Sequence, residues 1–298
     1  MKMTLYLVLC LVGLFSLQAC SGGEAISPDR YVDTDKLVST ITNNIENDPA
    51  LELVVDIDHS RLGDDAGSPI APSRVIIFSD KELESELIQL SPTAALDLPL
   101  RVLAFESGEE KKGSIIYNSF EYIKSRYQLE GDSVPGLAER YRVAMAAAVS
   151  STPESSSISF EDNTMRPDGI ITIDSPYDFD ETVARVKSAI ESQDDTMYFG
   201  TVDFQANARE VGIELLPSYM ILFGGPGPGG KVMSSAPTLG LDGFCQKFLV
   251  WQDSDGVTRL SFNDLLALAR RHQVSIPIVL RIVDFRLGNV FEEALKAE

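Results

Sequence analysis

The chain of 298 residues has few of the side chains on which catalysis and metal binding usually depend. It contains three cysteines, two histidines and one tryptophan. Its cysteines and histidines show no zinc-site spacing, and no G-x-S-x-G, H-E-x-x-H or paired-carboxylate motif is present. The sequence therefore indicates no metal, no cofactor and no catalytic residue. These absences lower the expectation of an enzyme without excluding one.

Basic residues are also scarce. The chain has 25 Lys and Arg against 45 Asp and Glu, which gives a formal net charge of −20. A surface this acidic repels phosphates, so we expect no nucleic-acid partner. It is repelled by anionic lipids as well, so attachment to a membrane would need a separate anchor.

Long apolar runs are missing, but a short one lies at the N-terminus. Residues 5–15 are almost wholly apolar, which is below the roughly 18 residues of a spanning helix. The letters LQAC follow and end at Cys20. They resemble a bacterial lipobox, which implies a signal peptide at residues 1–19 and lipid on Cys20. Ser21 after the cysteine resembles the enterobacterial signal for the outer membrane; the alternative is an ordinary signal peptide with an incidental cysteine.

Only one cysteine remains for the folded part of the mature chain. Cys10 lies in the signal peptide, so Cys245 has no partner for an intramolecular disulfide. It lies in the apolar run FCQKFLVW, with no histidine near it in sequence. We therefore expect a buried structural thiol rather than a nucleophile.

A shift of 145 residues aligns the chain with itself. The matching pairs include Asp58 with Asp203, Gly67 with Gly212, Pro72 with Pro217, Phe78 with Phe223, Asp97 with Asp242 and Asn118 with Asn263. After one extra residue in the second copy, Leu103 matches Leu249. So many matches at one offset indicate a duplicated domain, and the length also suits two domains.

The repeat divides the mature chain into four parts. We expect a lipidated tether at 20–30, a first domain at 31–149, an extended Ser/Pro-rich linker at 150–167 and a second domain at 168–298. In the second copy, apolar periodicity predicts strands at 169–173, 198–204, 219–223, 245–252 and 257–262, and helices at 178–191, 205–211, 263–272 and 276–295. The first copy follows the same order, with a hairpin through 106–113 and a last helix at 136–149, but lacks a match to the first strand.

Ordered blocks in both copies are similar to the domain-of-unknown-function 302 family. They are PSYMILFG, PTLGLD, KFLVWQDSDGVTRLSFND and ARRH in the second copy, and IDH, PSRVIIFSD, PTAALDLPLRVLAFE and YN in the first. The resemblance covers nearly all of the mature chain. It implies an α+β fold in two tandem copies of a two-layer domain, each a curved, mainly antiparallel sheet backed by helices in a TATA-binding-protein-like arrangement. Domains of this family often pair, so one chain could form the pair by itself as a monomer; the family implies no activity.

The same resemblance draws attention to the two histidines. The family pattern has histidine at His59 and at His272, where the other copy has Phe204 and Tyr127. Histidine is a natural ligand or proton-transfer group near neutral pH, and Asp58 lies beside the first one. Each histidine could instead be a hydrogen-bonded structural residue. One histidine per copy argues against duplicated chemistry but leaves a composite site possible.

Four polar residues recur at matching positions. Asp97 and Asp242 end the repeated PT-x-x-LD turn and could form a binding loop or hold the turn through backbone N–H groups. Asn118 and Asn263 fall where a strand gives way to a helix, which favours N-capping. The candidate ligand-binding residues are Asp58, His59, Asp97, Asn118, Asp242, Asn263 and His272.

One segment resembles a phosphate-binding loop. Residues 225–232 read GPGPGGKV, but Val232 replaces the required Ser or Thr, and Pro226 and Pro228 remove backbone donors. We therefore expect a mobile surface loop.

Three functional hypotheses remain. The first is a lipid-anchored, non-enzymatic envelope protein whose two domains form an intramolecular pseudo-dimer and bind a small ligand or an envelope protein. The second is a hydrolase-like or metal-assisted enzyme that uses His59 or His272 with a nearby aspartate. The third is a purely structural component of the envelope.

Overall fold

The computed structural model describes residues 28–107, 112–152, 155–158 and 169–296. Cys20, the predicted signal peptide and most of the predicted tether lie outside these residues. Within the described part of the chain, no helix combines the length and the apolarity that crossing a bilayer requires.

The first domain is a five-stranded sheet with helices. Its elements are η1 (Pro28–Tyr31), α1 (Val32–Asn47), β1 (Glu52–Asp58), α2 (His59–Asp65), β2 (Ser73–Ser79), α3 (Lys81–Leu90), η2 (Pro92–Asp97), β3 (Leu100–Ser107), β4 (Lys112–Asn118), α4 (Phe120–Arg126), α5 (Val134–Ala148) and β5 (Ser155–Ile158). The strand order is β1-β2-β3-β4-β5, and every pair is antiparallel except β4 with β5.

The second domain repeats this plan. Its elements are β6 (Ile170–Asp174), α6 (Phe179–Glu191), β7 (Met197–Asp203), α7 (Phe204–Glu210), β8 (Ser218–Gly224), α8 (Pro226–Met233), η3 (Pro237–Gly240), β9 (Gln246–Gln252), β10 (Thr258–Asn263), α9 (Leu265–Arg271) and α10 (Ile278–Ala294). The strand order is β6-β10-β9-β8-β7, all antiparallel. These elements confirm the predicted α+β fold and the order of strands and helices.

A shared irregularity shows how closely the copies correspond. The pairing of β1 with β2 shifts register between Leu53 and Val55, and that of β7 with β8 shifts between Tyr198 and Gly200. These positions are 145 residues apart, the offset found in the sequence. Because a β-bulge bends a strand at a defined place, both sheets bend in the same way at the same position.

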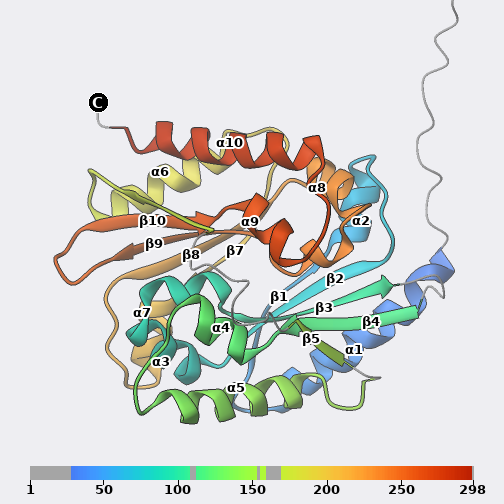
Figure 1. Ribbon diagram of the computed structural model, residues 1–298, viewed down its shortest axis with the longest axis horizontal. Helices are drawn as coiled ribbons and strands as arrows, with labels where there is room; N and C mark the ends of the chain where they lie inside the picture. Colours follow the sequence, from blue (N-terminus) through green and yellow to red (C-terminus); the bar gives the residue numbers. More distant parts are fainter. Residues whose placement is uncertain (1–27, 108–111, 153–154, 159–168, 297–298) are drawn as a thin grey trace, which may run out of the picture.

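The two sheets form the centre of a four-layer arrangement (Figure 1). Helices α6 and α10 cover the outer face of the second sheet, and α1 and α5 cover that of the first. Alternation along β9 shows why: Phe248 and Val250 pack in the cluster with the outer helices, whereas Leu249 packs in the cluster shared with the first domain.

The domains pair through matching elements. Helix α2 contacts α8 and α3 contacts α7, where α2 corresponds to α7 and α3 to α8 in the repeat. Likewise η2 packs on β9 and β10, while η3 packs on β2 and β3. The interface therefore has the isologous form of a two-fold dimer, built within one chain.

Two sequence predictions are wrong. Residues 225–232 do not form a loop, because Pro226–Met233 is helix α8, in which Gly229 and Gly230 are buried. The linker is not only an extended tether, because Ser155–Ile158 pairs in parallel with β4 and becomes the edge strand β5. It occupies the edge at which β6 lies in the second sheet.

Candidate functional site

A buried cluster of polar side chains lies where η2 and η3 bring the two domains together. We call it the polar core. It consists of Asp97, Arg101, Asn118, Tyr122, Arg126 and Tyr127 of the first domain and Asp242, Lys247, Asn263, Arg271 and His272 of the second. It therefore brings together five of the seven predicted site residues.

Asp97 is fully enclosed by donors of its own domain. Its Oδ2 accepts from Arg126 Nη1 at 2.7 Å, from the Tyr127 hydroxyl at 2.7 Å and from the Tyr122 hydroxyl at 3.0 Å. Burial alone would raise the pKa of this carboxyl, but the charges of Arg126, Arg271 and Arg101 outweigh it and hold the pKa far below its usual value. Asp97 is therefore a permanent buried anion.

Asp242 receives groups from both domains. Its Oδ1 accepts from Asn118 Nδ2 at 3.2 Å, and its Oδ2 lies 3.0 Å from His272 Nε2 and 3.4 Å from Arg271 Nη2. Arg101 lies between the two aspartates, 3.4 Å from Asp97 Oδ1 and 3.8 Å from Asp242 Oδ1. One guanidinium thus links the equivalent turns of the two domains.

The two asparagines do not cap helices, so this prediction is wrong. Ser119 caps α4 by accepting from Tyr122 N, and Asp264 caps α9 by accepting from Ala267 N. Asn118 instead donates across the interface to Asp242, and Asn263 Oδ1 accepts from Arg126 Nη2 of the first domain at 2.6 Å. Each asparagine ends its strand one residue before the cap and joins the domains.

His59 and Asp58 lie apart from this network. His59 is the first residue of α2, and its Nε2 donates to the carbonyl of Gly240 at 3.1 Å. Burial lowers the pKa of His59 to about 4, although the bond to Gly240 and the charge of Asp58 act in the opposite direction. Asp58 caps α2 by accepting from Arg61 N at 2.8 Å. The two histidines have different partners, because His59 binds the Gly240 carbonyl and His272 binds the Asp242 carboxylate.

Cys245 is buried, as expected, with 1% of its surface exposed. Burial raises the pKa of its thiol to about 12, despite the opposing charge of Arg101. The thiol is thus neutral near neutral pH and has no nucleophilic character.

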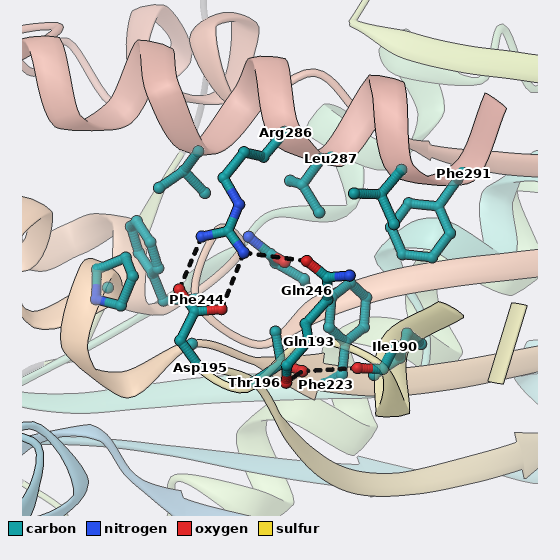
Figure 2. A pocket seen from close by; sticks show the side chains of 15 residues that line it. Ile190, Gln193, Asp195, Thr196, Phe223, Phe244, Gln246, Arg286, Leu287 and Phe291 are labelled. Carbon is teal, nitrogen blue, oxygen red and sulfur yellow. Dashed lines mark hydrogen bonds and ion pairs between the residues drawn. The ribbon is translucent and has the colours of Figure 1, made fainter. Parts of the chain in front are cut away.

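A separate groove opens beneath α10 (Figure 2). We call it the α10 groove; it encloses about 510 Å³ including the space at its mouth. Its apolar walls are formed by Ile190, Phe223, Phe244, Val283, Leu287, Val290 and Phe291. Its polar groups come from Gln193, Thr196 and Gln246 and from the ion pair of Arg286 with Asp195, whose atoms lie 2.7 and 2.9 Å apart. Figure 2 shows Arg286 reaching from α10 down to Asp195 at one end of the groove.

The helix above the groove, α10, buries fewer residues than α5, the last helix of the other copy. Helix α5 buries six residues, including Ala144 and Ala148. Helix α10 buries only Leu280 and Phe291. The spacing of apolar residues predicts helix α10, but it does not show how many of these residues are buried.

Comparison with known proteins supports the repeat. Residues 28–151 and 171–292 both match the family described as "Domain of unknown function DUF302". The crystal structure of an uncharacterized conserved protein DUF302 from Bacillus stearothermophilus is similar, with a TM-score of 0.37 and 16% identity, over 43% of this chain and 96% of that one.

Two curated relatives are named as channels. Fluoride-specific ion channel FluC 1 of Brucella suis biovar 1 (strain 1330) is 35% identical over 108 residues, which are 36% of this chain and 42% of that protein. Fluoride-specific ion channel FluC 2 of Brucella melitensis biotype 1 is also 35% identical over 108 residues, or 39% of its length. The chain therefore spans about two fifths of the length of these relatives. Because the family matches in both halves of a chain whose domains repeat each other element by element, this chain belongs to the DUF302 family and carries two tandem copies of its domain.

Proposed function

We propose that this protein is a lipid-anchored protein of the bacterial cell envelope, held in the outer membrane through Cys20, and that it binds a small molecule instead of catalysing a reaction. The LQAC sequence supports the anchor. Because the acidic surface gives little affinity for a membrane, lipid on Cys20 would be needed to hold the protein there. The pairing of the two domains within one chain supports a monomer.

The α10 groove is the observation that carries this proposal. It is a recess with mostly apolar walls and a few polar groups at one end, which is the usual form of a small-molecule site. Val283, Leu287 and Val290 are only partly buried although they face the protein. Covering these side chains with an apolar ligand would remove them from water, which stabilises the complex by about 25 cal/mol per Å² buried.

The polar groups of the groove suggest the ligand class. Gln193 Oε1 accepts from Arg286 Nη2 at 3.1 Å, so the amide and the ion pair form one connected polar end. Gln246 adds a further amide to the lining. We therefore expect an amphipathic molecule whose apolar body lies against Phe223 and Leu287 and whose hydrogen-bonding end reaches this polar end.

Binding is a better match than catalysis because the two aspartates and the histidine of the polar core are already engaged by other side chains of the protein. The side chains of Asp97, Asp242 and His272 are 0% exposed.

Native mass spectrometry tests the binding. We expect residues 21–298, purified gently from the native host, to carry a defined additional mass that identifies the ligand. Leu287→Trp should remove this mass by filling the groove, whereas Ile282→Trp, at a position 54% exposed on the same helix, should keep it. A wild-type protein without additional mass, or a mass retained by Leu287→Trp, would contradict the proposal.

Cell fractionation tests the anchor. We expect the full chain to be in the outer-membrane fraction and the Cys20→Ser variant to leave it, because acyl chains supply about 0.8 kcal/mol per buried CH₂. A variant that stays in the membrane fraction would show that another feature holds the protein there.

A further inference from the structure

Lys247 is buried and its amino group has no partner among the described residues. It is the second residue of β9 and is 3% exposed. Its Nζ makes no hydrogen bond there and no ion pair within 4.0 Å. Burying an unpaired charge is costly, so such groups are normally paired, hydrogen-bonded or neutralised.

The repeat shows what Lys247 lacks. It pairs with Leu222 in the second sheet, as Arg101 pairs with Ile77 in the first, and these positions correspond in the duplication. Arg101 reaches the aspartate of its own domain, Asp97, at 3.4 Å. Lys247 makes no equivalent contact with Asp242.

Asp242 does not fill this role because other donors occupy it. Its oxygens contact Asn118, His272 and Arg271 at 3.0–3.4 Å, with Arg101 at 3.8 Å. The positive groups around this single carboxylate therefore offset its charge. The charge of Asp242 would therefore not repel a second anion bound near Lys247.

The space beside Lys247 suits a small guest. Lys247 lines a cavity with room for about one water-sized species. Its other polar lining residues are Asp242, Gln246 and Asn263, and its apolar ones are Phe248, Phe262, Leu265 and Leu287. The cavity also shares Gln246 and Leu287 with the α10 groove, so the two spaces adjoin.

We propose that the polar core holds one small monovalent anion of halide size beside Lys247. The anion pairs with the ammonium group and completes the buried charge pattern between the domains. This site is distinct from the α10 groove and does not depend on the ligand proposed there.

Thermal unfolding at constant ionic strength tests the site. Sodium gluconate, whose anion is too large for the cavity, would be replaced stepwise by sodium fluoride, chloride or bromide. An anion that binds only the native state raises the unfolding midpoint, by about 3 °C for each tenfold rise above its dissociation constant. We expect the wild type to respond to at least one halide.

Two variants assign the response to Lys247. Lys247→Met removes the charge at similar length and should abolish the halide response, while Lys231→Met, at an exposed lysine of the same domain, should keep it. A wild type without a response overturns the proposal, as does a response that persists in Lys247→Met. If the wild type does not respond to halides and Lys247→Met is more stable than the wild type, Lys247 is buried without an anion.

Crystals of the wild type grown in bromide give a readout that does not need the variant to fold. For a wild type whose unfolding midpoint responds to bromide, we expect an anomalous peak beside Lys247 Nζ. Peaks confined to the surface would be an adventitious ion only and would overturn the proposal.

Discussion

At the scale of single residues, the balance between burial and neighbouring charge decides protonation. His59 and Asp97 are both buried. His59 has only a carbonyl and one aspartate to favour its charged form, so burial prevails and its pKa falls to about 4. Asp97 faces Arg126, Arg271 and Arg101, and there the positive charges prevail. Burial thus keeps the histidine neutral, whereas the neighbouring arginines keep the equally buried carboxylate ionised.

This balance predicts how stability depends on pH. The pKa of His59 in the folded protein is about 4, below the usual 6.5, so the unfolded chain takes up the proton first as the pH falls. The contribution of His59 is complete above pH 6.5 and is lost as the pH falls toward 4, by about 3 kcal/mol in all. In urea titrations, we expect the wild type to lose about 2 kcal/mol more than His59→Gln between pH 7 and pH 4.5. Equal losses would show that His59 does not cause the dependence.

The polar core also shows which site residues can be predicted from the sequence. Asp97, Asp242, Asn118 and Asn263 could be selected because they recur at one offset, and they do meet. The arginines were missed, although Arg126 and Arg271 recur at that offset too. Repetition identifies positions that both copies need, but it does not show which residues cross the interface. For this reason the asparagines were misassigned to helix caps.

At the scale of elements, α8 shows why its sequence was misinterpreted. Pro226 and Pro228 lie in the first turn of the helix, where backbone N–H groups have no intrahelical partner and proline is tolerated. The glycines permit a close approach to the other domain. A Cβ on Gly230 would lie 2.4 Å from the Ser68 carbonyl oxygen. The prolines and glycines that favour a loop in the sequence are thus compatible with a helix that packs against the backbone of the first domain.

The approach of α8 to the first domain predicts opposite effects of two similar changes. Gly230→Ala should destabilise the protein by about 1–3 kcal/mol because the methyl group collides with Ser68. Gly227→Ala has no neighbour nearer than 3.9 Å and should be neutral or stabilise the helix by up to about 1 kcal/mol. Chemical denaturation of both variants measures the difference. Equal effects would mean that α8 does not depend on this contact.

At the scale of the whole molecule, the largest apolar cluster extends through both domains. It contains Val75 and Leu103 of the first domain together with Met220, Leu222 and Leu249 of the second. Because neither domain keeps this core when the other unfolds, the two should lose structure together.

Calorimetry tests this coupling. We expect a single unfolding transition whose calorimetric enthalpy equals the van't Hoff enthalpy. Gly230→Ala, placed at the interface, should lower the midpoint of the whole transition. Two separate transitions would show that the domains are independent units joined by a linker.

The paired turns have a consequence for how such a molecule can change over generations. In a symmetric dimer of identical chains, every substitution appears on both sides of the axis, so each side must tolerate it. Here the two sides are encoded separately, and they have diverged: Tyr127 corresponds to His272, and Arg101 to Lys247. A substitution in one half therefore need not be tolerated at the corresponding position of the other.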